Sequence, residues 1–184
     1  MKEIMIDARR SDATMGRWAG LALVAGALAI VVTMSLHPTA SDVLRAGNES
    51  EHVLARNAAV HWLALASLPL LVFGFLELSR RLCFRRPEVS LAFVMFSLGT
   101  VAIMCAAVAS GLVATGVLRE LLTADEAARP VLQALFGYTG RVNQAFARVY
   151  VFASSCAVIL WSWSILRMKL RSTKLMGNRQ LCLS

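Results

Sequence analysis

Charged residues are scarce in this chain. Asp, Glu, Lys and Arg together make up 16% of its 184 residues, whereas 58% of the residues are hydrophobic. An ordinary soluble domain carries about 25% charged residues. The composition therefore excludes an ordinary soluble domain and favours a chain that lives in a bilayer.

The motifs of several enzyme classes are also missing. The sequence has no Gly-rich phosphate loop, no H-E-x-x-H, no nucleophile elbow and no pair of intramembrane aspartates. It has four cysteines but no C-x-x-C; Cys83 and Cys182 are predicted on the cytoplasmic side, and Cys105 and Cys156 lie inside apolar segments. A membrane oxidoreductase that generates disulfides needs paired cysteines on the outer side, so this class is excluded.

What the chain does contain is four long apolar segments. Each meets the roughly 20-residue length of a transmembrane helix, and they cover about Trp18–Leu36, Ala58–Leu78, Val89–Leu118 and Ala145–Met168. The first is longer than the apolar run of a signal peptide, so we expect it to be retained. The sequence thus predicts an all-α integral membrane protein, with one four-helix domain over residues 18–168, a cytoplasmic segment 1–17 and a basic tail 169–184.

The basic residues predict the orientation of this domain. Thirteen of the 19 fall on one side if four helices alternate: Lys2, Arg9, Arg10, Arg17, Arg80, Arg81, Arg85, Arg86, Arg167, Lys169, Arg171, Lys174 and Arg179. Basic residues favour the cytoplasmic side of a membrane. We therefore expect an antiparallel bundle in a bacterial inner membrane with both termini in the cytoplasm. The net charge of +8 is a topology signal and not a sign of nucleic-acid binding.

Smaller features predict details of the bundle. A polar and small-residue stripe in the third segment predicts its inward face, and it consists of Ser97, Thr100, Met104, Gly111 and Thr115. Trp161 and Trp163 are expected to anchor the fourth helix at the membrane interface. In the loop before that helix, Thr123 and Glu126 match a capping box. Pro130 and Gly137 then predict a short amphipathic helix on the outer end of the bundle.

All three histidines fall between Thr33 and Trp62, at the outer boundary of the first two helices. His37 shares a helix face with Gly26 and Thr33, which predicts that it points toward neighbouring helices. His52 and His61 are nine positions apart and so lie on opposite sides of one helix. That spacing disfavours a three-histidine metal site, and the small residues of the second helix lie about 120° from His61, which argues against an inward His61.

The fourth helix begins with a second group of polar residues. Asn143, Gln144 and Arg148 come within its first two turns, and a charge at such a depth is expensive in lipid. Two interpretations are open: Arg148 extends to the outer interface, or it points inward and binds an anion.

These residues lead to two hypotheses of function. The first is a polar pocket on the periplasmic side that holds a metal ion, haem b or a small anionic ligand. His37 and His61 would be the metal ligands, and Asn143, Gln144 and Arg148 would line the pocket. Met34 competes as a haem ligand, and a third metal ligand would have to be Asp42 or Glu51. The second hypothesis is a non-catalytic accessory subunit or homo-oligomer protomer of a larger membrane complex, in which the histidines are dispensable.

Overall fold

The protein is all-helical in the part of the chain that the computed structural model describes, residues 2–38 and 50–174. Its elements are α1 (Lys2–Leu36), α3 (Ser50–Arg81), α4 (Pro87–Ala107), the π-helical η2 (Val108–Val113), α5 (Ala114–Thr123) and α6 (Arg129–Lys174). Since α4, η2 and α5 follow one another without a break, these ranges contain four helical rods. Each is long and apolar enough to cross a membrane.

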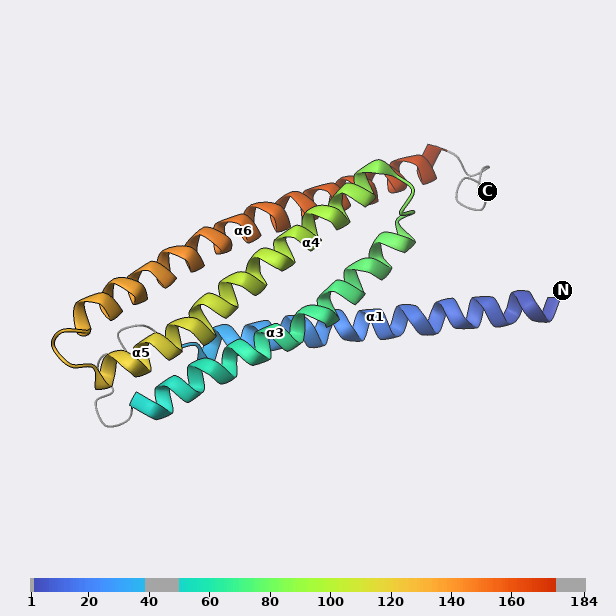
Figure 1. Cartoon of the computed structure of the whole chain (residues 1–184). Helices are drawn as coiled ribbons and strands as arrows, with labels where there is room; N and C mark the ends of the chain where they lie inside the picture. The colour runs from blue at the N-terminus through green and yellow to red at the C-terminus, as the bar shows by residue number, and fades with distance from the viewer. Residues whose placement is uncertain (1, 39–49, 175–184) are drawn as a thin grey trace.

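The four rods run antiparallel along one long axis (Figure 1). At one end lie the start of α1, the α3–α4 turn and the end of α6; we call it the basic end. At the other, the histidine end, lie the end of α1, the start of α3 and the α5–α6 turn. Packing is mainly between α1 and α3, between α3 and α4–η2, and between α4 and α6. The flanking helices α1 and α6 do not pack extensively against each other.

Glycines allow α1 and α3 to approach closely. A Cβ on Gly74 would overlap Leu23, and a Cβ on Gly26 would lie 2.8 Å from Leu71. Close backbone approach replaces the hydrophobic effect between helices in lipid. The predicted contact face of the first helix is therefore confirmed, and Thr33 on that face is buried and donates a hydrogen bond to the carbonyl of Val60 at 3.3 Å.

An aromatic core fills the basic half of the molecule. Trp161 is only 3% exposed and stacks on Phe75 with a ring-centroid distance of 4.7 Å, and its Nε1 donates to Oγ of Ser79 at 3.0 Å. The prediction that Trp161 anchors the interface is therefore wrong, because the indole has found both a stacking partner and a hydrogen-bond acceptor inside the protein. Trp163, two residues on, is exposed and lies under the guanidinium of Arg167.

The π-helical η2 changes which side of the third rod faces each neighbouring helix. Gly99 in α4 packs against Ala153 and Ser154 of α6, whereas Gly111 in η2 packs against His61 of α3. A π-helix contains more residues per turn than an α-helix and so rotates the faces that follow it. The predicted inward stripe is wrong at one position: Thr100, Gly111 and Thr115 are buried, but Met104, in α4 before the π-helical turn, is 44% exposed.

The fourth rod differs most from the expectation. No separate amphipathic helix precedes it, because α6 runs without interruption from Arg129 to Lys174. Pro130 does stand in the first turn, as predicted, but Gly137 does not end the helix. The preceding residue, Phe136, packs on the buried Leu54 and Leu118, and this contact holds the first turns of α6 against the bundle. A single interior glycine costs only about 1 kcal/mol, so packing overrides it.

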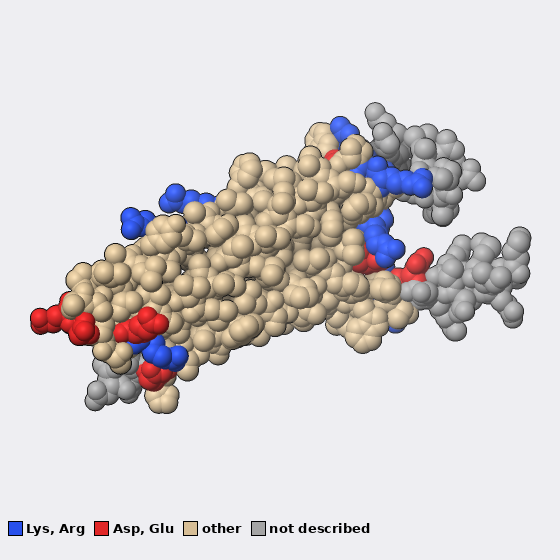
Figure 2. Space-filling view, in the orientation of Figure 1, with Lys and Arg blue, Asp and Glu red and all other residues tan. Residues whose placement is uncertain are grey.

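Charged side chains gather mainly at the two ends, with some basic ones along one edge near the histidine end, and leave a wide uncharged belt (Figure 2). At the basic end Arg81 pairs with Glu77 at 3.0 Å and donates to the carbonyl of Asp12, which ties α3 to α1. At the histidine end Arg119 of α5 makes two hydrogen bonds to Glu51 of α3, at 3.0 and 3.2 Å. Exposed pairs of this kind contribute little stability, but they mark where the belt ends.

Candidate functional site

Two histidines from different helices meet at the histidine end. His37 directly follows the last residue of α1, and His61 lies in the fourth turn of α3. Their Nε2 atoms are 3.3 Å apart and their ring centroids 4.8 Å apart. His61 is 5% exposed. The structure thus brings together the two residues that the sequence singled out as metal ligands.

The burial of His61 comes from the two contact faces of α3. The face with Ser67 and Gly74 packs on α1, and the face with Asn57 and His61 packs on η2 and α5. A single inward face centred on the small residues of α3 argues against an inward His61. With neighbours on two sides, faces about 120° apart are both buried.

Backbone carbonyls select the tautomer of both rings in their neutral form. His61 Nδ1 donates to the carbonyl of Asn57 at 2.7 Å, and His37 Nδ1 donates to the carbonyl of Pro38 at 2.9 Å. A carbonyl oxygen only accepts, so each Nδ1 carries the proton. In a neutral imidazole the other nitrogen is then an acceptor. In this form both Nε2 atoms are acceptors, and they lie 3.3 Å apart.

The π-helical turn shapes one wall of this space. Gly111 lies so close to His61 that a Cβ there would overlap the ring. The hydroxyl of Ser110 lies 2.9 Å from His61 Nε2 and also 2.9 Å from the carbonyl of Ala106. Its single proton serves one of these acceptors at a time. π-Helical turns are frequent at functional sites, and here the turn places a hydroxyl beside the histidine pair.

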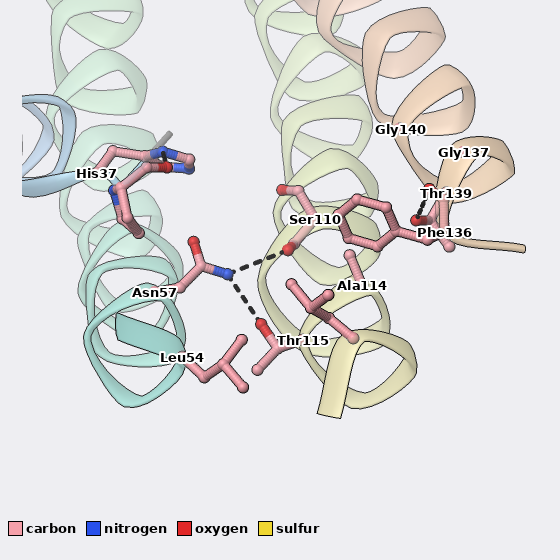
Figure 3. Close-up of a pocket in the computed structure, with 12 residues that line it drawn as sticks. His37, Leu54, Asn57, Ser110, Ala114, Thr115, Phe136, Gly137, Thr139 and Gly140 are labelled. Atoms are coloured by element: carbon pink, nitrogen blue, oxygen red, sulfur yellow. Dashed lines mark hydrogen bonds between the residues drawn. The ribbon is translucent and has the colours of Figure 1, made fainter. Parts of the chain in front are cut away.

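Asn57 connects α3 to the same wall. Its Nδ2 donates to Oγ1 of Thr115 at 2.8 Å and to the carbonyl of Ser110 at 3.3 Å (Figure 3). Thr115 in turn donates to the carbonyl of Gly111 at 2.6 Å. Sequence reasoning did not assign Asn57 and Ser110 to the site. The only signal for them was a polar residue within one turn of His61 and another in a long apolar run.

Two cavities meet at the histidine pair. One has a volume of about 270 Å³ and opens at the histidine end, between Asn57 and Thr115 on one side and Phe136 and Thr139 on the other (Figure 3). The second, of about 290 Å³, extends from the pair toward the middle of the bundle between all four rods. His37 and Ser110 line both cavities. Ligands therefore have access to Nε2 of His37 from two directions.

The other predicted site residues divide into two groups. Asn143 lines the deeper cavity. Gln144 and Arg148 are exposed, and neither lines the two cavities at the histidine pair.

The candidates for a third metal ligand give no further support within the described structure. His52 is exposed, and Glu51 is engaged with Arg119. Asp42 lies outside the described residues. Within those residues no three His, Cys, Asp or Glu side chains converge on one point. The site offers two histidine nitrogens, a serine hydroxyl and two cavities.

Comparison with known proteins gives no relative: no protein-family model, no curated protein and no solved structure matches this chain.

Proposed function

We propose that this chain is an integral protein of a bacterial inner membrane that binds one divalent transition-metal ion between His37 and His61, on the periplasmic side. One observation carries the proposal: Nε2 of the buried His61 and Nε2 of the exposed His37 lie 3.3 Å apart, and both are acceptors when the two rings are neutral. Like-oriented lone pairs repel, and a cation between them removes that repulsion. Imidazole nitrogen is a common ligand of zinc, copper, iron and nickel.

The spacing of the two nitrogens supports a tetrahedral ion. Zinc binds histidine nitrogen at about 2.0–2.1 Å, so two nitrogens of a tetrahedral site lie about 3.3 Å apart. Nε2 of His37 and Nε2 of His61 are 3.3 Å apart. Each ring also donates its Nδ1 proton to a carbonyl, which is the usual support of a metal-bound histidine.

The same spacing disfavours haem. Two axial nitrogens lie on opposite sides of the iron, about 4 Å apart, with the porphyrin plane between them. The rings here meet edge to face at an interplanar angle of 64°, with Ser110 against one of them. Arg148, the proposed partner of a haem propionate, is exposed and lies outside both cavities.

The distribution of charge supports the orientation. Arg80, Arg81, Arg85, Arg86 and Arg167 all belong to the basic end. The positive-inside rule places that end in the cytoplasm. The histidine pair is then near the periplasmic surface, where the outer cavity opens.

Metal analysis of the purified protein tests the proposal. After loading with Zn²⁺ and removal of free metal, we expect one zinc per chain, and a loss of about 100-fold in affinity in His37→Ala and in His61→Ala. His52→Ala is the matched control, because His52 is exposed on the same helix as His61. A metal-free wild type, or equal loss in all three variants, contradicts the proposal and favours the accessory-subunit hypothesis. A coloured preparation with a haem absorption band contradicts the zinc geometry and favours haem.

A further inference from the structure

The deeper cavity extends over the same number of residues along each of the four rods. At its polar end stand His37, His61, Ser110 and Asn143, one from each rod. Seven residues deeper along each rod it ends at Ile30, Leu68, Ile103 and Tyr150. Seven helical residues span about 10 Å. The cavity is therefore a slot two helical turns tall that runs parallel to the long axis of the bundle.

The slot has a polar end and an apolar body. Between its two ends it is lined by Met34, Ala64, Leu65, Ala106, Ala107 and Ala147, besides Thr33. The Thr33 hydroxyl donates to the carbonyl of Val60, so its proton is not available to a ligand. An apolar cavity with a few polar groups at one end suits a ligand with an apolar body and one polar head.

The slot reaches the apolar surface of the protein. Met34 of α1 lines it and is 70% exposed. Ala147 of α6 lines the opposite side, and α1 and α6 do not pack extensively against each other. The side between α1 and α6 is therefore the one from which a ligand dissolved in the bilayer would enter.

The charge of a bound metal ion specifies the head group. A divalent ion on two neutral imidazoles keeps its charge of +2, and an uncompensated charge in a low-dielectric site is costly. The described residues around His37 and His61 include no carboxylate that reaches the site, and Glu51 is paired with Arg119. Two protein ligands also leave coordination positions open.

We propose that the slot binds an anionic amphiphile of the fatty-acid type, whose carboxylate completes the coordination of the metal ion and whose acyl chain fills the slot. The proposal rests on the metal site proposed above. The head supplies the negative charge that the described residues lack, and the acyl chain runs along the slot toward its apolar end at Ile30, Leu68, Ile103 and Tyr150. The bound acid displaces water from the metal, and no covalent bond of the acid changes.

Native mass spectrometry tests the proposal, because it detects bound zinc and bound fatty acid as separate mass shifts. The full-length protein in a maltoside detergent is titrated with dodecanoic acid, with and without Zn²⁺. We expect acid binding to the zinc-loaded protein to be at least about tenfold stronger than to the metal-free protein. The methyl ester of the same acid has the same chain without the charge, and zinc should not strengthen its binding.

Two variants distinguish acid binding in the slot from metal binding at the histidine pair. Ala147→Phe fills the slot without removing a ligand, so we expect zinc to remain and acid binding to fall by about tenfold or more. Ala145→Phe is the matched control, since Ala145 is an exposed residue of the same helix that does not line the slot.

Distinct results overturn the two proposals. A protein that binds zinc but prefers the ester, or binds the acid equally in Ala147→Phe, rules out the amphiphile and leaves the metal site standing. Zinc binding that is lost in Asp42→Asn shows that the chain supplies its own counter-charge, which also overturns the amphiphile. A protein that binds no zinc overturns the metal site first.

Discussion

Single side chains at the histidine pair are held by contacts that tolerate little change. Gly111 contacts the ring of His61 directly, and the ring also donates to the carbonyl of Asn57. Protein interiors are packed like crystals, so a ring fixed on two sides has one position. The spacing of 3.3 Å between the two Nε2 atoms therefore depends on residues that bind nothing themselves.

Gly111→Ala should move His61 and weaken the metal site. The added methyl group overlaps the ring, so either the ring or the backbone has to shift, at a cost of about 1–3 kcal/mol in stability. We expect lower zinc affinity by titration and a lower unfolding midpoint in detergent. Gly116→Ala is the control, because a Cβ at Gly116 meets nothing within 4 Å and should leave zinc affinity unchanged. Equal zinc affinity in Gly111→Ala would show that the ring is not held by this contact.

Asn57→Leu should loosen the connection between α3 and the π-helical turn. The substitution removes the hydrogen bonds to Thr115 and Ser110 and keeps a side chain of similar size. Hydrogen bonds between membrane helices contribute about 0.6–1.7 kcal/mol, so we expect a loss of that order in the free energy of unfolding. Arg56→Gln, at an exposed neighbouring position, should change little. A loss of the same size in Arg56→Gln would contradict this role of Asn57.

At the scale of helices, length and hydropathy predicted the four rods because both are local properties of the sequence. Which side of each rod is buried was less predictable. Trp161 was expected at the membrane interface, and the helix phase argued against an inward His61; both residues are buried, because burial depends on which neighbours a helix meets. The π-helical turn at Val108–Val113 has no sequence signature, although it decides that Gly111 faces α3. The pairing of His37 with His61 depends on the neighbours that α3 meets and on the π-helical turn. It could not be predicted from the spacing of the two histidines in the sequence.

Gly137→Ala distinguishes the continuous α6 from the short helix that the sequence suggested. In a continuous helix Gly137 has ordinary helical geometry and open space for a Cβ, so alanine should stabilise the protein by about 0.5–1 kcal/mol. If a helix instead ended at Gly137 in a left-handed conformation, alanine would destabilise it. Gly140→Ala, one turn further along α6 and equally open, should give the same gain. Unfolding midpoints measured in one detergent compare the three proteins.

At the scale of the whole molecule, the orientation of the bundle in a membrane would decide which compartment supplies the proposed metal ion. The start of α1 and the end of α6 lie at the same end, so both face the same compartment if all four rods span (Figure 1). The outer cavity opens at the opposite end (Figure 3). The fold thus links the location of the termini to the location of the site, and the charges select one of two orientations.

Reporter fusions measure that choice. Green fluorescent protein at the carboxyl end should fluoresce, because it matures in the cytoplasm, and alkaline phosphatase there should be inactive. Alkaline phosphatase inserted after Glu126, in the α5–α6 turn, should be active, because that turn belongs to the histidine end. The opposite pattern would contradict the positive-inside assignment and place the histidine pair near the cytoplasm. Replacing Arg80, Arg85 and Arg86 with glutamine should shift part of the population toward that opposite pattern, because these residues lie close to the ends of two rods.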